Sequence, residues 1–215
     1  MRTLVVSARP GHAAPVKVVL LPAAYTGPED FVQAGFAQAV RARGLDVDLV
    51  FSALEFKHVT DRSVVTQVHE KLLAPAQAHG CAVWLGGISL GGYVALCCAE
   101  RDPGALAGLA LFAPYLGSYI VTSEIARVGL ASWPAAELSD DDDERRVWRF
   151  LKTRVRGAPP LHLGLGREDR FGERHRLLAA ALDPADVDTV PGGHDWPTWL
   201  RLWENFLDAR LAPRA

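Results

Sequence analysis

One serine in this chain lies in a pattern suited to nucleophilic catalysis. The run Gly87-Ile88-Ser89-Leu90-Gly91 reads G-x-S-x-G, between a predicted strand, Cys81–Leu85, and a predicted helix, Leu90–Glu100. A strand-to-helix turn of this kind exposes the serine hydroxyl on a strained backbone, so the flanking residues must lack bulk. The free N–H of Leu90 at the helix start can donate to an oxyanion. The pattern predicts Ser89 as a nucleophile.

Serine is a poor nucleophile at neutral pH and needs a base. Of the seven histidines, His194 has the most suitable context, because it follows a predicted strand and the turn Pro191-Gly192-Gly193, and it precedes a predicted helix. His162 lies inside a predicted strand, and we expect a satisfied core histidine there. Three others are expected to be solvated: His58, His69 and His79.

The acid that orients the base is expected after a strand, between serine and histidine in the chain. The turn Gly166-Arg167-Glu168-Asp169 follows a predicted strand and offers two carboxylates, and Asp195 beside His194 is a third candidate. Asp195 lies near the start of the last predicted helix, where its negative charge would interact favourably with the helix dipole. Glu168 and Asp169 point in different directions from this turn, so only one of them is expected to face His194.

The elements that must position these residues are short apolar runs alternating with longer amphipathic ones. The predicted strands are Thr3–Ser7, Val16–Leu21, Asp46–Phe51, Cys81–Leu85, Gly108–Phe112, Leu161–Leu165 and Val187–Val190. The predicted helices are Glu29–Arg43, Asp61–His79, Leu90–Glu100, Tyr119–Leu130, Asp141–Arg156, Glu173–Leu182 and Trp196–Leu211. This alternation predicts one α/β domain over residues 1–215, with a mostly parallel sheet of about seven strands and helices on both faces.

The alternation pauses between about residues 115 and 160, which is long for a loop within a compact domain. We expect a small cap or lid inserted between two strands. Its apolar residues could line a small pocket: Tyr119, Ile120, Trp133, Trp148 and Phe150. The acidic run Asp140–Glu144 could suggest a cation site, but acids in a first turn after an N-cap at Ser139 explain it better.

The serine turn, the Gly166-to-Asp169 turn and Gly192-Gly193-His194 together resemble the α/β-hydrolase superfamily over most of the chain. The resemblance implies an α/β-hydrolase fold and favours as the acid the carboxylate three residues after the strand-ending Gly166. We therefore predict Asp169, which makes the order Ser89, Asp169, His194. The resemblance also implies a second oxyanion donor from the loop after Val16–Leu21. By position the donor would be the N–H of Ala24, with Tyr25 as the alternative. This loop has Pro22 and Ala23 where many members carry His-Gly.

Composition excludes several other classes. The chain has 215 residues, 49% of them hydrophobic, and a formal net charge of -2, so no basic surface for nucleic acid is expected. No apolar run is long enough for a membrane span. Three cysteines, two of them adjacent, fit reduced thiols in a cytoplasmic protein. No metal-binding pattern is present, and no cofactor is expected.

The leading interpretation is hydrolysis of a small-molecule acyl ester or thioester through an acyl-enzyme. Acyl transfer, amide cleavage, peracid formation and C–C hydrolysis could use the same triad. A non-catalytic binding protein of the same fold is a further alternative. A nucleotide-dependent oxidoreductase is disfavoured, because Asp169 replaces the third glycine of a motif beginning Gly164-Leu165-Gly166. The sequence leaves the oligomeric state open.

Overall fold

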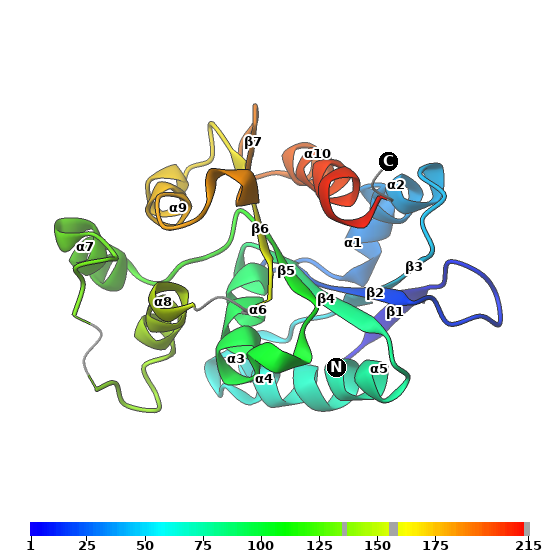
Figure 1. Cartoon of the computed structure of the whole chain (residues 1–215), viewed down its shortest axis with the longest axis horizontal. Helices are drawn as coiled ribbons and strands as arrows, with labels where there is room; N and C mark the ends of the chain where they lie inside the picture. Colours follow the sequence, from blue (N-terminus) through cyan, green and yellow to red (C-terminus); the bar gives the residue numbers. More distant parts are fainter. Residues whose placement is uncertain (135–136, 155–158, 213–215) are drawn as a thin grey trace.

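The computed structural model describes residues 1–134, 137–154 and 159–212, and its centre is one seven-stranded sheet. The strands are β1 (Thr3–Val6), β2 (Val16–Leu21), β3 (Val47–Ser52), β4 (Ala82–Ile88), β5 (Gly108–Phe112), β6 (Leu161–Gly166) and β7 (Val187–Val190). Their order across the sheet is β1-β3-β2-β4-β5-β6-β7 (Figure 1). Only β1 is antiparallel to its neighbour, so the carboxyl ends of the other six share one edge.

Ten α-helices lie in the described part of the chain. They are α1 (Pro28–Gln33), α2 (Phe36–Ala42), α3 (Phe56–Thr60), α4 (Ser63–Val68), α5 (Ala74–Ala78), α6 (Leu90–Arg101), α7 (Tyr119–Val128), α8 (Asp143–Thr153), α9 (Gly172–Ala179) and α10 (Trp196–Phe206). Helices α1, α2 and α10 cover one face of the sheet, and α4 to α6 cover the other (Figure 1). The predicted mostly parallel α/β architecture is confirmed.

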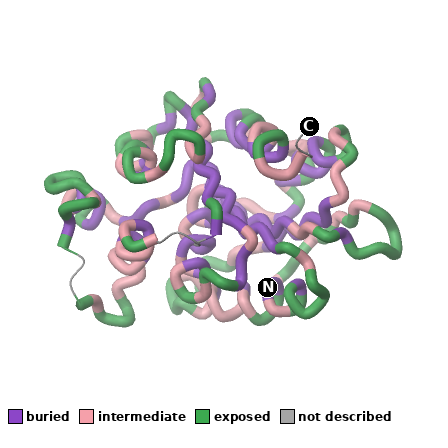
Figure 2. The backbone as a smooth tube through the Cα atoms, viewed as in Figure 1, coloured by how far each residue is buried: buried purple, intermediate pink, exposed green. Residues whose placement is uncertain are grey.

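Strands β2 to β6 are largely buried on both faces, which explains their mostly apolar sequences, whereas the edge strands β1 and β7 are partly exposed. In β2, Val19 and Leu21 pack under α6, whereas Val18 and Leu20 face α2 and α10. Figure 2 shows this burial as a continuous band through the centre of the molecule. A rigid sheet of this kind holds the loops at its carboxyl edge in fixed positions.

Two predicted helices are interrupted. The predicted helix Glu29–Arg43 is divided into α1 and α2 because Gly35 adopts a left-handed conformation, with φ of 93°. The predicted helix Asp61–His79 contains a π-helical turn at His69–Leu73, just before Pro75. Proline removes a backbone donor and crowds the preceding turn, so a wider turn accommodates it. Helix α3 was not predicted.

The segment between β5 and β6 contains α7 and α8 but differs in detail from the prediction. Helix α8 begins after Asp142, whose side chain accepts from the Arg145 N–H, so the predicted cap at Ser139 is wrong. Trp133 and Trp148 are fully buried in the core instead of lining a pocket. Tyr119 and Ile120 are exposed, and each borders an open hollow at the surface. The last residues of the predicted helix, Val155 and Arg156, lie outside the described residues.

His162 in β6 is buried between the rings of Phe112 and Phe206, as expected. Within the described ranges its Nε2 has no hydrogen-bond partner, so it is not the satisfied histidine that was predicted. Burial lowers its pKa to about 4, because the charged imidazolium is poorly solvated there.

We expect this histidine to make the fold sensitive to acid. Above pH 6.5, the pKa of His162 in the unfolded chain, the imidazole is neutral in both the folded and the unfolded state. Between pH 6.5 and 4, His162 is protonated in the unfolded chain but stays neutral in the folded protein, so acid favours unfolding. The free energy of unfolding should fall by about 3 kcal/mol from this group between pH 6.5 and 4. Urea titrations of the native protein and His162→Leu should show a flatter pH dependence in the variant. The exposed His79→Leu is the control, and equal slopes in all three would contradict the prediction.

Candidate active site

Ser89 occupies a sharp turn between β4 and α6. Its backbone has φ of 51° and ψ of -112°, a conformation that costs a non-glycine residue free energy. Its N–H donates to the Phe112 carbonyl at 3.0 Å, and its carbonyl accepts from Tyr93 and Tyr115 N–H groups at 3.2 and 2.9 Å. Three hydrogen bonds from separate elements therefore hold the strained turn.

The glycines around Ser89 are required for close backbone approach. A Cβ on Gly87 would lie 2.2 Å from the carbonyl carbon of Gly91, and a Cβ on Gly91 would lie 2.2 Å from the Leu21 oxygen. The first contact allows the turn to close. The second places the loop after β2 directly against the first turn of α6, where helix N–H groups have no partner within the helix.

His194 and Asp169 meet at the carboxyl edge of the sheet. Nδ1 of His194 lies 2.7 Å from Oδ2 of Asp169, and their side chains are 9% and 0% exposed. The rings of Phe171 and Trp199 contact the imidazole edge-to-face at 5.0 and 5.1 Å. The hydrogen bond and the two rings together fix the plane of the imidazole.

Asp169 is ionised in this setting. Burial raises its pKa, but hydrogen bonds from His194 and from the Phe171 N–H, at 2.8 Å, outweigh that effect and bring the pKa below its usual value. An ionised carboxylate at Nδ1 favours the tautomer with the proton on Nδ1, which leaves Nε2 free to accept a proton.

The other two candidate acids make different contacts. The Asp195 side chain caps α10 by accepting from the Thr198 N–H at 3.0 Å, as the sequence suggested. The Glu168 carboxylate accepts from the N–H of Gly192 and makes no hydrogen bond to the imidazole. Of the three carboxylates, Asp169 alone bonds His194.

Ser89, Asp169, His194 and Ala24 follow β4, β6, β7 and β2, and therefore lie along one edge of the sheet. Among the described residues no hydrogen bond joins the Ser89 hydroxyl to His194. Such bonds are often long in free enzymes. Ala24 is exposed in a turn closed by the Thr26 N–H and the Ala23 carbonyl, with Tyr25 at φ of 63° and 99% exposed.

A second histidine near this site had no distinguishing signal in the sequence. His175 in α9 is 1% exposed, and its Nε2 lies 3.1 Å from the Pro114 carbonyl. Burial lowers its pKa, so the ring is neutral. This contact joins the helix after the Asp169 turn to the segment after β5, whose Tyr115 binds the Ser89 carbonyl.

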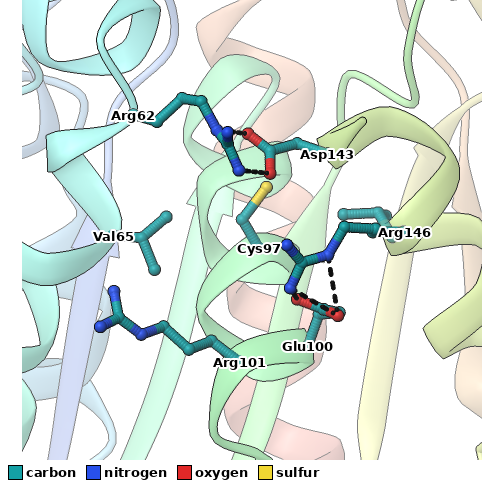
Figure 3. Close-up of a pocket in the computed structure, with 8 residues that line it drawn as sticks. Arg62, Val65, Cys97, Glu100, Arg101, Asp143 and Arg146 are labelled. Carbon is teal, nitrogen blue, oxygen red and sulfur yellow. Dashed lines mark hydrogen bonds and ion pairs between the residues drawn. The ribbon is translucent and has the colours of Figure 1, made fainter. Parts of the chain in front are cut away.

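A cavity of about 200 Å³ lies between α4, α6 and α8 (Figure 3). Its wall includes Cys97, whose pKa burial raises to about 12, so the sulfur is a thiol and not a reactive thiolate. Two of its cations are paired: Arg62 with Asp143 and Arg146 with Glu100. These paired charges and the unreactive thiol indicate that the cavity is a packing site between three helices and not a catalytic site.

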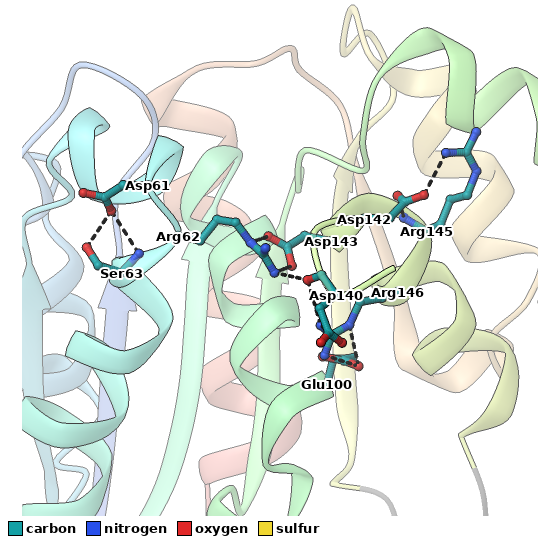
Figure 4. A network of polar contacts seen from close by, with 9 residues as sticks. All are labelled: Asp61, Arg62, Ser63, Glu100, Asp140, Asp142, Asp143, Arg145 and Arg146. Carbon is teal, nitrogen blue, oxygen red and sulfur yellow. Dashed lines mark hydrogen bonds and ion pairs between the residues drawn. The ribbon is translucent and has the colours of Figure 1, made fainter. Parts of the chain in front are cut away.

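The same ion pairs attach the start of α8 to the rest of the fold (Figure 4). Arg62 binds Asp143 with two hydrogen bonds, and Arg146 binds Glu100 at 2.9 Å. Glu144 accepts from the Tyr115 hydroxyl at 2.8 Å and from the Ser118 N–H at 2.9 Å. The start of helix α8 is therefore bound to three other segments: the residue before α4, helix α6 and the segment after β5.

The described ranges contain no cluster of three or more histidine, cysteine or acidic side chains arranged to hold a metal ion. They also contain no helix with the length and apolar character needed to cross a membrane.

No model of a known protein family matches this sequence, and no curated protein matches it. Solved structures do match. The fluorophosphonate-binding serine hydrolase FphF of Staphylococcus aureus aligns with a TM-score of 0.64 at 11% identity, covering 96% of this chain and 90% of that one. An S-formylglutathione hydrolase from Agrobacterium tumefaciens aligns at 0.64 and 16% identity, covering 98% and 90%. A ferulic acid esterase aligns at 0.62 and 12% identity, covering 98% and 91%. These likenesses show the α/β-hydrolase fold.

Proposed function

We propose that this chain, which has the α/β-hydrolase fold, is a serine hydrolase that cleaves a carboxylic ester or thioester through an acyl-enzyme. The observation that carries the proposal is the pairing of His194 with buried Asp169 at the sheet edge where Ser89 occupies its strained turn. The folds of the similar structures, named as a serine hydrolase, an S-formylglutathione hydrolase and a ferulic acid esterase, support it.

In this mechanism the Ser89 hydroxyl attacks the acyl carbon while Nε2 of His194 removes its proton. Asp169 holds the ring by Nδ1 and stabilises the imidazolium that forms. The tetrahedral intermediate then expels the alcohol or thiol, which takes the proton from His194. Water, activated by the same imidazole, attacks the acyl-enzyme and regenerates Ser89.

The oxyanion would accept hydrogen bonds from the N–H groups of Leu90 and Ala24. Leu90 is the first residue of α6, where both the free N–H and the helix dipole favour negative charge. Contact between Gly91 and the Leu21–Pro22 backbone brings the Ala24 loop beside that helix start. Donors from two elements could then bind one oxygen.

A panel of acyl esters and thioesters of graded chain length tests the function. Turnover of one of them at a rate far above the uncatalysed reaction would support hydrolysis, and adding a competing alcohol would reveal acyl transfer. No turnover of any ester, thioester or amide, with intact fold, would favour the non-catalytic alternative.

We also propose a cytoplasmic setting, because all three cysteines are free thiols.

We expect hydrolysis of soluble short- to medium-chain acyl substrates without interfacial activation. We propose that α8, within the expected cap, keeps a fixed position, because ion pairs and the Glu144 contacts bind it to three other segments of the chain. Interfacial activation requires a cap that opens at a lipid surface, so an enzyme with a fixed cap should not show it. Rates measured below and above the critical micelle concentration of a long-chain ester should show no sharp rise, and a sharp rise would contradict the prediction.

A further inference from the structure

The turn that carries His194 is bonded to the turn that carries Asp169. The Gly192 N–H donates to the Glu168 carboxylate, and the Glu168 N–H donates to the Gly192 carbonyl at 3.1 Å. The Arg167 N–H donates to the Val190 carbonyl at 2.9 Å, which continues the pairing of β6 with β7. The two turns are therefore held edge to edge.

The histidine turn, Pro191-Gly192-Gly193, contains two glycines, which have no side chains that could hold it in place. Gly192 has φ of 122°, and a Cβ there would lie 2.2 Å from Thr198 Oγ1. A Cβ on Gly166 would lie 2.4 Å from the Gly192 oxygen, so the contact is backbone against backbone. In the described part of the chain, Glu168 makes the one side-chain hydrogen bond to the backbone of Pro191-Gly192-Gly193, whereas Asp169 binds the His194 side chain.

We propose that Glu168 is a positioning residue for the catalytic histidine. The two adjacent carboxylates have different roles. Asp169 binds the imidazole of His194, and Glu168 binds the backbone N–H of Gly192, two residues before His194. Loss of the Glu168 contact would let the turn move and would weaken the alignment of His194 on Asp169. The inference rests on the proposed function of Ser89, Asp169 and His194.

The test compares substitutions that keep or remove the acceptor. Glu168→Ala should lower kcat on the order of 10- to 100-fold with KM nearly unchanged, because a small misplacement of a catalytic group has effects of this size. Glu168→Gln should keep most of the activity, because its amide oxygen can accept the same N–H. Glu173→Ala, an exposed carboxylate on α9, is the matched control. Glu168→Asp, whose shorter side chain reaches less far, serves if the alanine variant does not fold.

A second readout does not depend on turnover. The proton shared by His194 Nδ1 and Asp169 should give a downfield NMR resonance that persists in Glu168→Gln and broadens or disappears in Glu168→Ala. An unchanged resonance and kcat in Glu168→Ala at equal thermal stability would overturn the proposal, as would equal losses in both variants. If the wild type lacks all hydrolytic activity, the proposed function fails, while the resonance still decides whether Glu168 positions the ring.

Discussion

Replacing Ser89 by alanine is expected to lower kcat for the best ester of the panel by at least about 10⁴-fold. The acyl-enzyme cannot form without the hydroxyl, so only transition-state stabilisation by the remaining groups is left. Alanine keeps the Cβ, and therefore the same backbone conformation, so circular dichroism and thermal unfolding should match the wild type. Steady-state kinetics on both proteins would measure the effect.

A covalent probe provides an independent check on the same residue. A fluorophosphonate should add one adduct to the wild type, and mass spectrometry should map it to the peptide that contains Ser89. Ser132→Ala, a change at an exposed serine, should leave both labelling and kcat unaffected. Labelling that persists in Ser89→Ala would show that another residue is the nucleophile.

Asp169→Asn is expected to lower kcat by about 10³- to 10⁴-fold. The asparagine amide can present N–H groups to Nδ1 of His194, which places the imidazole in the wrong tautomer, and it no longer offsets the imidazolium charge. The substitution is nearly isosteric, so KM and the fold should change little. Kinetics at saturating substrate, with folding checked by circular dichroism, would measure the loss.

The two neighbouring carboxylates provide the comparison. Asp195→Asn should remain active, because asparagine also caps helices well and this side chain only caps α10. Glu168→Gln should remain active because its oxygen can still accept from Gly192. A crippled Glu168→Gln beside an active Asp169→Asn would place the triad acid one residue earlier.

The centre of the sheet could be predicted from sequence because strands β2 to β6 are largely buried on both faces. Runs such as Val16–Leu21 and Gly108–Phe112 are apolar enough to predict their bounds without error. Strand β4 extends three residues further than predicted, through Gly86 and Gly87 to Ile88. Glycine is rare in strands, but a Cβ on Gly86 would lie 2.7 Å from the Ala110 oxygen, so close packing requires it here.

Other features depend on contacts that a single sequence does not reveal. Nothing local distinguishes Glu168 from Asp169, because the difference lies in which atoms of the histidine turn each carboxylate meets. Trp133 and Trp148 look like pocket residues until their N–H groups are seen to bond Glu124 and the Leu116 carbonyl inside the segment. Tertiary packing decided both cases.

The order of the strands also has a consequence for how the protein folds. Ser89 and His194 are about a hundred residues apart in the chain, and parallel strands cannot pair until the intervening helices have crossed over. Contacts between such distant segments slow folding, because loop closure must precede the gain from packing. During synthesis the Ser89 turn can form early, whereas His194 reaches Asp169 only after β7 and α10 dock. Appearance of the proposed activity would therefore report completion of the fold.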